Sequence, residues 1–307
     1  MGNNLSIRYI QRDKIDIEKW DHCITHSPNG LIYAYTYYLD HMAKHWLALV
    51  LNDYEVVMPL AWNRKFGISY LYQPFITAQL GIFGPNMSAQ LVEAFLYAIP
   101  KTFRFWDIYL NHQNVFPLQN FSLYQRKNYV LDLDKTYREL YRNYRENIQR
   151  NIKKAEQLGC KVVKGFDVKQ VVTLAKEQMR TYSKESADNM ERFCRLYDYL
   201  EKRGQATTYG VHSNNNELIA SAVFFFSHNR AYYILVGNHP NGRTIGASHM
   251  LVDAFIKDHA GKKMLLDFEG SDIRNLAFFY SSFGAVEENY AAIKLNELPF
   301  YLKWLKK

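Results

Sequence analysis

The sequence predicts an α+β fold made of two domains of like topology, with mixed, largely antiparallel sheets flanked by helices. The chain has 307 residues, which is long for one domain, and 48% of them are hydrophobic against 22% charged. That composition excludes a disordered or collagen-like chain. The order of predicted elements also repeats: each half contains two helices, a run of antiparallel strands, a helix and further strands.

The first half begins with a strand and two helices, and a meander of short apolar strands follows. Turn residues at 81–86 separate this meander from a helix that Ser88 can cap. The predicted elements are a strand at 5–10, helices at 16–25 and 36–43, strands at 46–52, 55–62 and 68–73, a helix at 88–99, and strands at 104–110 and 122–133.

The second half follows the same order. Three alternating segments, spaced by polar turns at 213–216 and 227–229, are typical of an antiparallel meander. The predicted elements are a strand at 161–164, helices at 167–182 and 188–202, strands at 206–212, 217–227 and 230–237, a helix at 247–259, a strand at 263–268, a helix at 273–283 and a strand at 287–295.

A basic segment joins the halves. Residues 135–164 hold nine basic and three acidic side chains, so they supply six of the eight net positive charges of the chain. The pattern predicts one helix over 136–158 that ends at Gly159, with an apolar stripe through Tyr144, Ile148 and Ile152. The cationic face beside the stripe either binds a phosphorylated partner or RNA, or is a solvated face of a linking helix. Its candidate binding residues are Arg145, Arg150, Lys153 and Lys154.

A turn before the predicted helix at 247–259 is a candidate phosphate site. Small side chains at the N-terminus of a helix leave backbone N–H groups open to an anion. The alternative is an ordinary helix start, with Thr244 or Ser248 near the cap position. The candidate residues of this turn are Arg243, Gly246, Ala247 and Ser248.

Three acidic residues follow the predicted strand at 263–268. An acid at the end of a strand can accept a proton from an amine. Asp272 or Ser271 is expected to cap the next helix, and for Asp267 and Glu269 a catalytic and a structural role both stay open.

The sequence predicts neither a metal site nor a membrane span. The histidine pairs at 22/26 and 41/45 have helical spacing but no third ligand. The three cysteines are too few and too scattered for a disulfide framework. Apolar runs are of strand length, well short of the roughly 20 residues of a membrane helix. The N-terminal segment has no apolar core of the kind found in secretory signals. We therefore expect a cytoplasmic protein.

Three segments carry a resemblance to a known family. They are the basic helix around 144–155, the run Leu266-Asp267-Phe268-Glu269-Gly270, and the run from Leu276 to Gly284 that contains Phe278-Phe279-Tyr280. Together they resemble the Fem family of bacterial peptidyltransferases, which add amino acids to peptidoglycan precursors and belong to the GNAT acyltransferase-like superfamily. The family implies two tandem GNAT-like domains, here 1–134 and 161–307, joined by the basic helix at 135–160.

The resemblance implies a transferase that moves an acyl or aminoacyl group to an amine, without a metal. It implies a phosphorylated substrate, and either an acyl-CoA or an aminoacyl-tRNA as the donor. Asp267 or Glu269 would act as the base, and Tyr280 stands where the family has a lysine. The turn matches the acyl-CoA pyrophosphate loop of GNAT enzymes at Arg243 and Gly246. An acetyl-CoA-dependent N-acetyltransferase and a non-catalytic RNA- or nucleotide-binding protein on the same scaffold are the alternatives.

Overall fold

The computed structural model describes residues 6–179, 187–270 and 272–299, which form two compact units. The first unit comprises residues 1–126 and 289–307, and the second comprises residues 127–288. The predicted linking segment at 135–160 lies within the second unit, because its apolar stripe is part of that unit's core. The last strand contributes residues 292–296 to the first unit, where they pair with residues 105–109.

The first unit is a mixed sheet with three α-helices. Its helices are α1 (Ile17–His26), α2 (Thr36–Met42) and α3 (Ala89–Tyr97), and the last of these is capped by Ser88, as predicted. The strands β4 and β5 pair in parallel, and the other pairs of this unit are antiparallel. The strands are β1 (Ile7–Gln11), β2 (His45–Leu51), β3 (Val56–Lys65), β4 (Ile68–Tyr72), β5 (Phe105–Tyr109) and the later part of β12 (Val286–Asn296).

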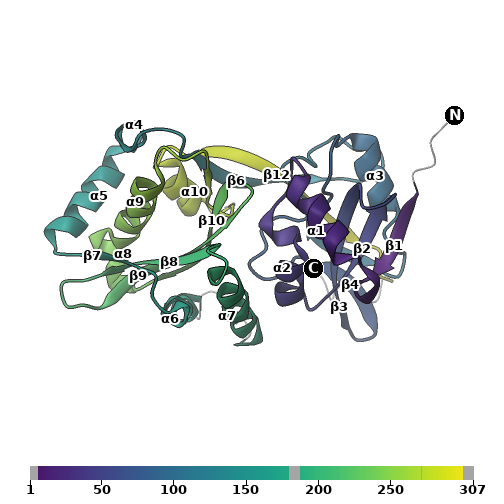
Figure 1. Cartoon of the computed structure of the whole chain (residues 1–307), viewed down its shortest axis with the longest axis horizontal. Coiled ribbons are helices and arrows are strands. Elements are labelled where there is room, and N and C mark those ends of the chain that lie inside the picture. Colours follow the sequence, from purple (N-terminus) through teal and green to yellow (C-terminus); the bar gives the residue numbers. More distant parts are fainter. Residues whose placement is uncertain (1–5, 180–186, 271, 300–307) are drawn as a thin grey trace. The chain divides into compact units, whose positions relative to one another are not determined.

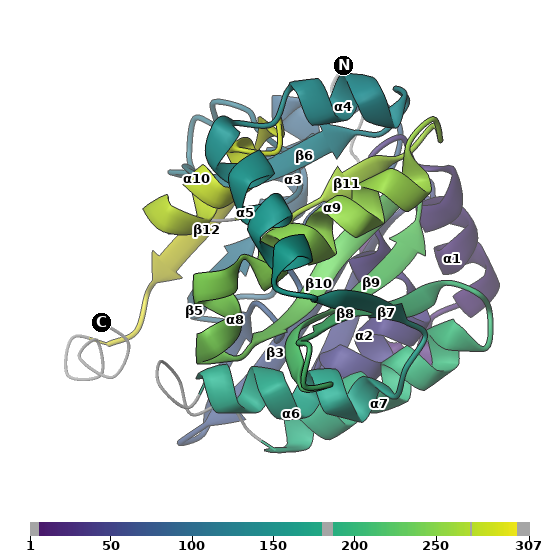
Figure 2. The same ribbon diagram turned by 90° about the vertical axis from the view of Figure 1, so that its left-hand side faces the viewer.

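The second unit is a sheet in the order β6-β11-β10-β9-β8-β7 with helices on both faces. The helices α5 and α9 cover one face, and α6 and α7 cover the other (Figures 1 and 2). The antiparallel meander of β8, β9 and β10 is confirmed. The elements are β6 (Tyr124–Asp132), β7 (Lys161–Lys164), α6 (Val168–Met179), α7 (Ala187–Glu201), β8 (Ala206–His212), β9 (Leu218–Ser227), β10 (Arg230–Asn238), α9 (Ala247–His259), β11 (Leu265–Asp267) and α10 (Arg274–Ser281).

The basic segment forms two helices, so the prediction of a single helix over 136–158 is wrong. The first, α4 (Tyr137–Arg142), starts with a capping box of Thr136 and Glu139. The second, α5 (Glu146–Gln157), starts at Arg145, whose backbone is extended and whose N–H donates to the carbonyl of Ser282 at 2.9 Å. This tertiary hydrogen bond turns the chain between the helices. The predicted apolar stripe is confirmed, since Tyr144, Ile148 and Ile152 are buried.

A buried carboxylate anchors α4 on α9. Asp253 of α9 is almost fully buried, and the Tyr137 hydroxyl donates to its two oxygens at 2.9 and 3.1 Å. Burial raises the pKa of Asp253, while the hydrogen bond from Tyr137 acts in the opposite direction. The Lys257 ammonium lies 5.6 Å from the centre of the Tyr137 ring. The aromatic side chain therefore connects α4 to both a carboxylate and a cation.

We expect Tyr137→Phe to lower the free energy of unfolding by about 1–3 kcal/mol, because a buried acceptor loses its donor. Thermal or urea unfolding measures this change. Tyr141→Phe is the matched control, since the Tyr141 hydroxyl donates to no described residue while its ring packs against the same core. Equal losses in the two variants would contradict the role of the Tyr137 hydroxyl.

Candidate functional site

The candidate site of the second unit lies where β10 and β11 diverge. The parallel pairing of these strands covers only residues 230–232 of β10 and 265–267 of β11. Beyond that point β10 continues to Asn238, with a shift of register against β9 between Tyr233 and Leu235. Because β11 ends, one edge of β10 has no strand partner over this stretch among the described residues. Such an edge presents backbone groups to which an extended ligand can add as a further strand.

Aromatic side chains fill the space beside this divergence. The ring of Phe268, directly after β11, stacks on Tyr280 of α10 with 4.6 Å between centroids. Tyr233 of β10 meets Phe268 edge-on. Burial raises the pKa of Tyr280 above its ordinary value, and the charge of Glu269 adds to the effect. The Tyr280 hydroxyl therefore keeps its proton at neutral pH and can act as a hydrogen-bond donor.

Asp267 is a member of a buried ion cluster. Its side chain is 2% exposed, and its Oδ2 accepts from the Arg230 guanidinium at 2.7 Å. Arg230 also donates to both oxygens of Glu288, at 2.5 and 2.9 Å, and its pKa is raised by the two carboxylates. Asn128 donates to Asp267 at 2.9 Å and to Glu288 at 3.3 Å. Asp267 is thus held by partners inside the protein and is not presented to a ligand.

Glu269 occupies a different environment two residues further on. Its side chain is half-buried, and its backbone is left-handed with φ of 67°, which is uncommon for a residue other than glycine. The Glu269 N–H donates to Asp267 Oδ1 at 2.9 Å. Asp267 therefore fixes the strained backbone that carries Glu269. The backbone position of Glu269 therefore depends on Asp267.

Asp272 does not cap α10, contrary to the prediction. Its carboxylate accepts from the backbone N–H of Lys127 at 3.2 Å, and Ile273 occupies the N-cap position without a side-chain hydrogen bond. Ser271 lies outside the described residues. The described hydrogen bond of Asp272 thus joins it to a residue 145 positions away in the sequence.

The predicted phosphate turn is covered by α5. Residues predicted as a loop form a short helix, α8 (Pro240–Ile245), which contains Arg243, whose side chain is not among those described. Gly246 follows with φ of 84°, and a Cβ there would lie 2.4 Å from the carbonyl oxygen of Asn151 in α5. Gly246 and Ala247 are buried. A glycine is needed at position 246 because the backbone of Asn151 leaves no room for a side chain.

Two side chains close the same turn further. The Lys154 ammonium donates to the carbonyl of Thr244 at 2.9 Å. The Ser248 hydroxyl donates to the side chain of Asn238 at 2.7 Å. Both predicted ligand-binding residues are thereby engaged with the protein itself.

His249, which the sequence analysis did not single out, lies beside this turn. Its Nε2 is 3.3 Å from the Asn151 side-chain nitrogen, and its ring meets Phe279 edge-on. Its Nδ1 is buried without a hydrogen-bond partner among the described residues. Burial lowers the pKa of His249 to about 4, so the ring is neutral at pH 7. A lone histidine on a helix gives no sequence signal that would have identified it.

The cationic face of α5 remains open at two of its four predicted positions. Arg150 and Lys153 are exposed on α5 and flank Asn151, which covers the turn. Lys154 is the residue that reaches Thr244. The Arg145 guanidinium lies 4.7 Å from the centre of the Phe278 ring of α10. Lys154 therefore contacts the turn and Arg145 contacts α10, while Arg150 and Lys153 are exposed on α5.

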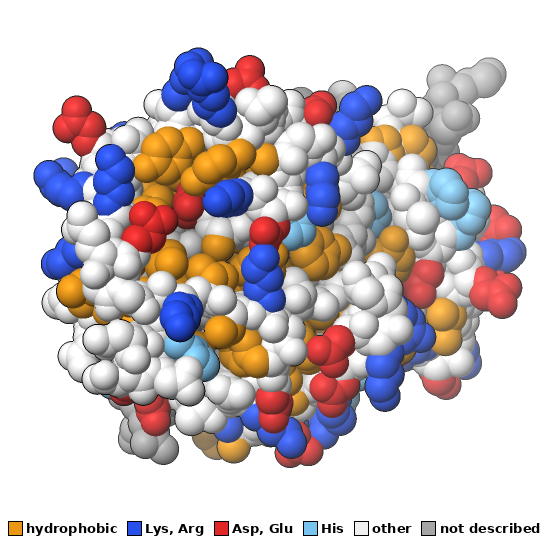
Figure 3. Space-filling view, turned by 60° about the vertical axis from the view of Figure 1, so that its left-hand side comes forward, with side chains coloured by type: hydrophobic (Ala, Val, Ile, Leu, Met, Phe, Trp, Pro, Cys, Tyr) orange, Lys and Arg blue, Asp and Glu red, His pale blue; other side chains and the backbone are white. Residues whose placement is uncertain are grey.

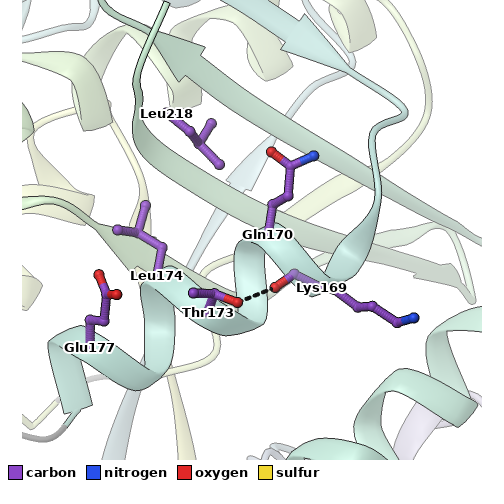
Figure 4. Close-up of a pocket in the computed structure, with 6 residues that line it drawn as sticks. All are labelled: Lys169, Gln170, Thr173, Leu174, Glu177 and Leu218. Atoms are coloured by element: carbon purple, nitrogen blue, oxygen red, sulfur yellow. Dashed lines mark hydrogen bonds between the residues drawn. The ribbon is translucent and has the colours of Figure 1, made fainter.

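A shallow pocket of about 330 Å³ lies elsewhere in the second unit, between α6 and the start of β9. Figure 4 shows the side chains that line it, including the Thr173 hydroxyl that donates to the Lys169 carbonyl. No predicted site residue lines it. The polar side chains of this pocket have the spacing of any solvated helix face. The sequence pattern therefore does not indicate that a pocket is present. Across the described ranges no group of three or more His, Cys, Asp or Glu is placed to hold a metal ion, and no helix has the length and apolar character to span a bilayer.

Comparison with known proteins finds a match for part of the chain and several structures of similar fold. Residues 142–272 match the acetyltransferase (GNAT) domain family. The crystal structure of FemX is similar with a TM-score of 0.64 at 13% identity, over 97% of this chain and 99% of that one. A conserved protein of unknown function from Bacteroides thetaiotaomicron gives 0.60 at 12% identity, over 95% and 100%. No curated protein matches the sequence.

A third similar structure is the C-terminal domain of a putative lysylphosphatidylglycerol synthetase from Agrobacterium fabrum. Its TM-score is 0.57 at 8% identity, over 94% of each chain. At these identities the likeness is one of fold, which is the predicted GNAT-like α+β architecture. The match over residues 142–272, together with this fold, supports an acyltransferase that contains a GNAT-type domain.

GNAT domains generally use an acyl-CoA donor, so the turn can be tested for its fit to that group. A pyrophosphate at the N-terminus of α9 would need the amides after Gly246 to be accessible. In this chain the Asn151 carbonyl, the Lys154 side chain and α8 lie against that turn. The residues present do not fit a pyrophosphate at this position.

We expect Arg230→Met to lower the free energy of unfolding by about 3–5 kcal/mol, because it leaves Asp267 and Glu288 buried without their cation. Chemical denaturation measures the loss. Arg195→Met is the control, since its pair with Glu191 is exposed and is worth at most about 0.5 kcal/mol. A loss as small as that of the control would show that the cluster does not hold the site together.

Because burial keeps His249 neutral, we expect the free energy of unfolding to depend on pH. Its pKa is about 4 in the folded chain, against 6.5 for the ordinary group, so the unfolded chain takes up the proton first as the pH falls. Stability is therefore lost between about pH 6.5 and pH 4, by up to about 3 kcal/mol. His249→Gln should remove this part of the slope in unfolding experiments at several pH values. Identical slopes for the two proteins would mean that His249 is not buried in its neutral form.

Proposed function

We propose that the second unit transfers an acyl or aminoacyl group to an amine, from a phosphorylated donor other than a CoA ester bound at the α9 turn. The covered Gly246 is the observation that carries this proposal. The likeness of the fold to FemX and to a lysylphosphatidylglycerol synthetase domain supports it. A resident acyl-CoA, as in an N-acetyltransferase, is the second candidate, because the GNAT domain match favours it.

The acceptor and the acyl group would meet beside the diverging strands. The amine nitrogen attacks the acyl carbon, a C–N bond forms, and the bond from that carbon to the leaving oxygen breaks. Glu269 takes the proton that the nitrogen loses and passes it to the leaving oxygen, to which the Tyr280 hydroxyl also donates a hydrogen bond. Asp267 is a positioning residue in this scheme, because it accepts from the Glu269 N–H and not from the substrate.

Charge on α5 would hold the phosphorylated part of the donor. Arg150 and Lys153 are exposed on α5, the helix that packs on the closed turn through Asn151. A polyanion such as tRNA gains affinity from each phosphate that such side chains neutralise, and the affinity falls as salt is added. Cytoplasmic localisation and a tRNA or nucleotide partner are parts of this proposal.

The test follows release of a labelled acyl group from two donors, acetyl-CoA and a pool of aminoacyl-tRNAs, with primary amines and cell-wall precursors as acceptors. We expect release from aminoacyl-tRNA, and a loss of at least about 100-fold in Glu269→Gln with an unchanged melting temperature. Substituting Gln for both Arg150 and Lys153 should weaken tRNA binding and reduce its salt slope by about two.

Two variants serve as controls in the same assay. Glu217→Gln removes an exposed carboxylate, and Lys202→Gln removes an exposed cation at the end of α7; both should leave release and binding unchanged. Release from acetyl-CoA would favour the N-acetyltransferase. Binding of tRNA without any release would favour a non-catalytic RNA-binding protein on this scaffold.

A further inference from the structure

The helix α10 is buried at one end only. Tyr280 near its C-terminal end packs in the core, but the first part of the helix leaves large apolar side chains in solvent. Leu276 is 41% exposed, Phe278 is 51% exposed, and Ile273 at the N-cap is 63% exposed. Single exposed apolar residues are ordinary, whereas three within six positions are characteristic of an interaction surface.

Arginine side chains accompany this apolar surface. The Arg145 guanidinium lies over the exposed ring of Phe278. Arg274 on α10 and Arg142 at the end of α4 are exposed as well, and Asn143 next to it contacts the turn after α10. Acidic side chains in the same region are Glu146, in the first turn of α5, and Asp272, which accepts from Lys127. On the side of the molecule that carries α4 and α5, hydrophobic side chains are exposed among Lys and Arg and some Asp and Glu (Figure 3).

We propose that the exposed end of α10, with Arg142, Arg145 and Arg274, binds the surface of an anionic lipid bilayer. A bilayer interface accepts both kinds of group at once: the apolar side chains enter the boundary between head groups and acyl chains, and the guanidinium groups stay at the phosphates. The stacking of Arg145 on Phe278 places a cation directly beside the ring that enters.

Charge and chemistry distinguish the bilayer from other partners. Nucleic acid would neutralise the arginines but has no use for exposed Ile273 and Leu276. A second copy of this chain docked by the same face would bring Arg145 and its neighbours against an equally cationic surface, which is unfavourable. An anionic bilayer can take up the apolar side chains of this surface and also bind its arginines.

The experiment is flotation of the full chain, without donor or acceptor, with vesicles of phosphatidylcholine alone and with about one third phosphatidylglycerol added. We expect binding to the anionic vesicles only, weakened by salt. Phe278→Ser should reduce the partition coefficient about tenfold, and Arg145→Gln should reduce it about fivefold. These side chains are exposed, so the variants should fold with unchanged melting temperature.

Phe66→Ser is the matched control. Phe66 is 77% exposed and also carries a cation, since the Lys65 ammonium lies 5.4 Å from its ring centre, but it belongs to the turn after β3 in the first unit. Its substitution should leave vesicle binding unchanged. Absence of binding, binding that Phe278→Ser does not weaken, or an equal loss in Phe66→Ser would overturn the proposal. Because no acyl transfer is measured, this outcome is independent of the proposed reaction.

Discussion

The buried contact between Arg230, Asp267 and Glu288 is the constraint on which the candidate site depends. One guanidinium faces two carboxylates in a place from which water is largely excluded, so none of the three charges is tolerable without the others. The three residues lie at the start of β10, the end of β11 and the start of β12. The cluster therefore fixes where β11 stops, and Asp267 still has an oxygen available for the Glu269 N–H. The position of Glu269 beside Tyr280 is a consequence of this charge balance.

The placement of α5 decides which donors the fold can take. In this chain the backbone at Asn151 approaches Gly246 so closely that no other residue fits there. The same approach, which packs α5 on α9, covers the backbone of Gly246 directly before α9. The cations Arg150 and Lys153 are exposed on α5, while Lys154 of the same helix donates to the turn itself. A single helix packing thus covers Gly246 and leaves two cations of α5 exposed.

The sequence predicted the features that depend on local patterns. Strands, the Ser88 cap and the apolar stripe of α5 follow from residue spacing, and all are present. It did not predict the break at Arg145, because the hydrogen bond to Ser282 joins distant segments. It misplaced Asp272 for the same reason, since the competing donor is the Lys127 N–H. The burial of Asp267 depends on Arg230, 37 positions away, so no local pattern could separate its role from that of Glu269.

The short helix α10 connects the candidate site to the exposed apolar surface. Its eight residues extend about 12 Å, with Tyr280 at the inner end and Leu276 nearer the outer end. Arg145 fastens this helix twice, through its N–H to Ser282 and its guanidinium over Phe278. A ligand that orders the outer end would thus also restrict the inner one. If the outer end rests on a bilayer, an amine at the lipid surface lies within about one helix length of Tyr280. An acceptor carried by a membrane would then need no separate soluble carrier to reach the site.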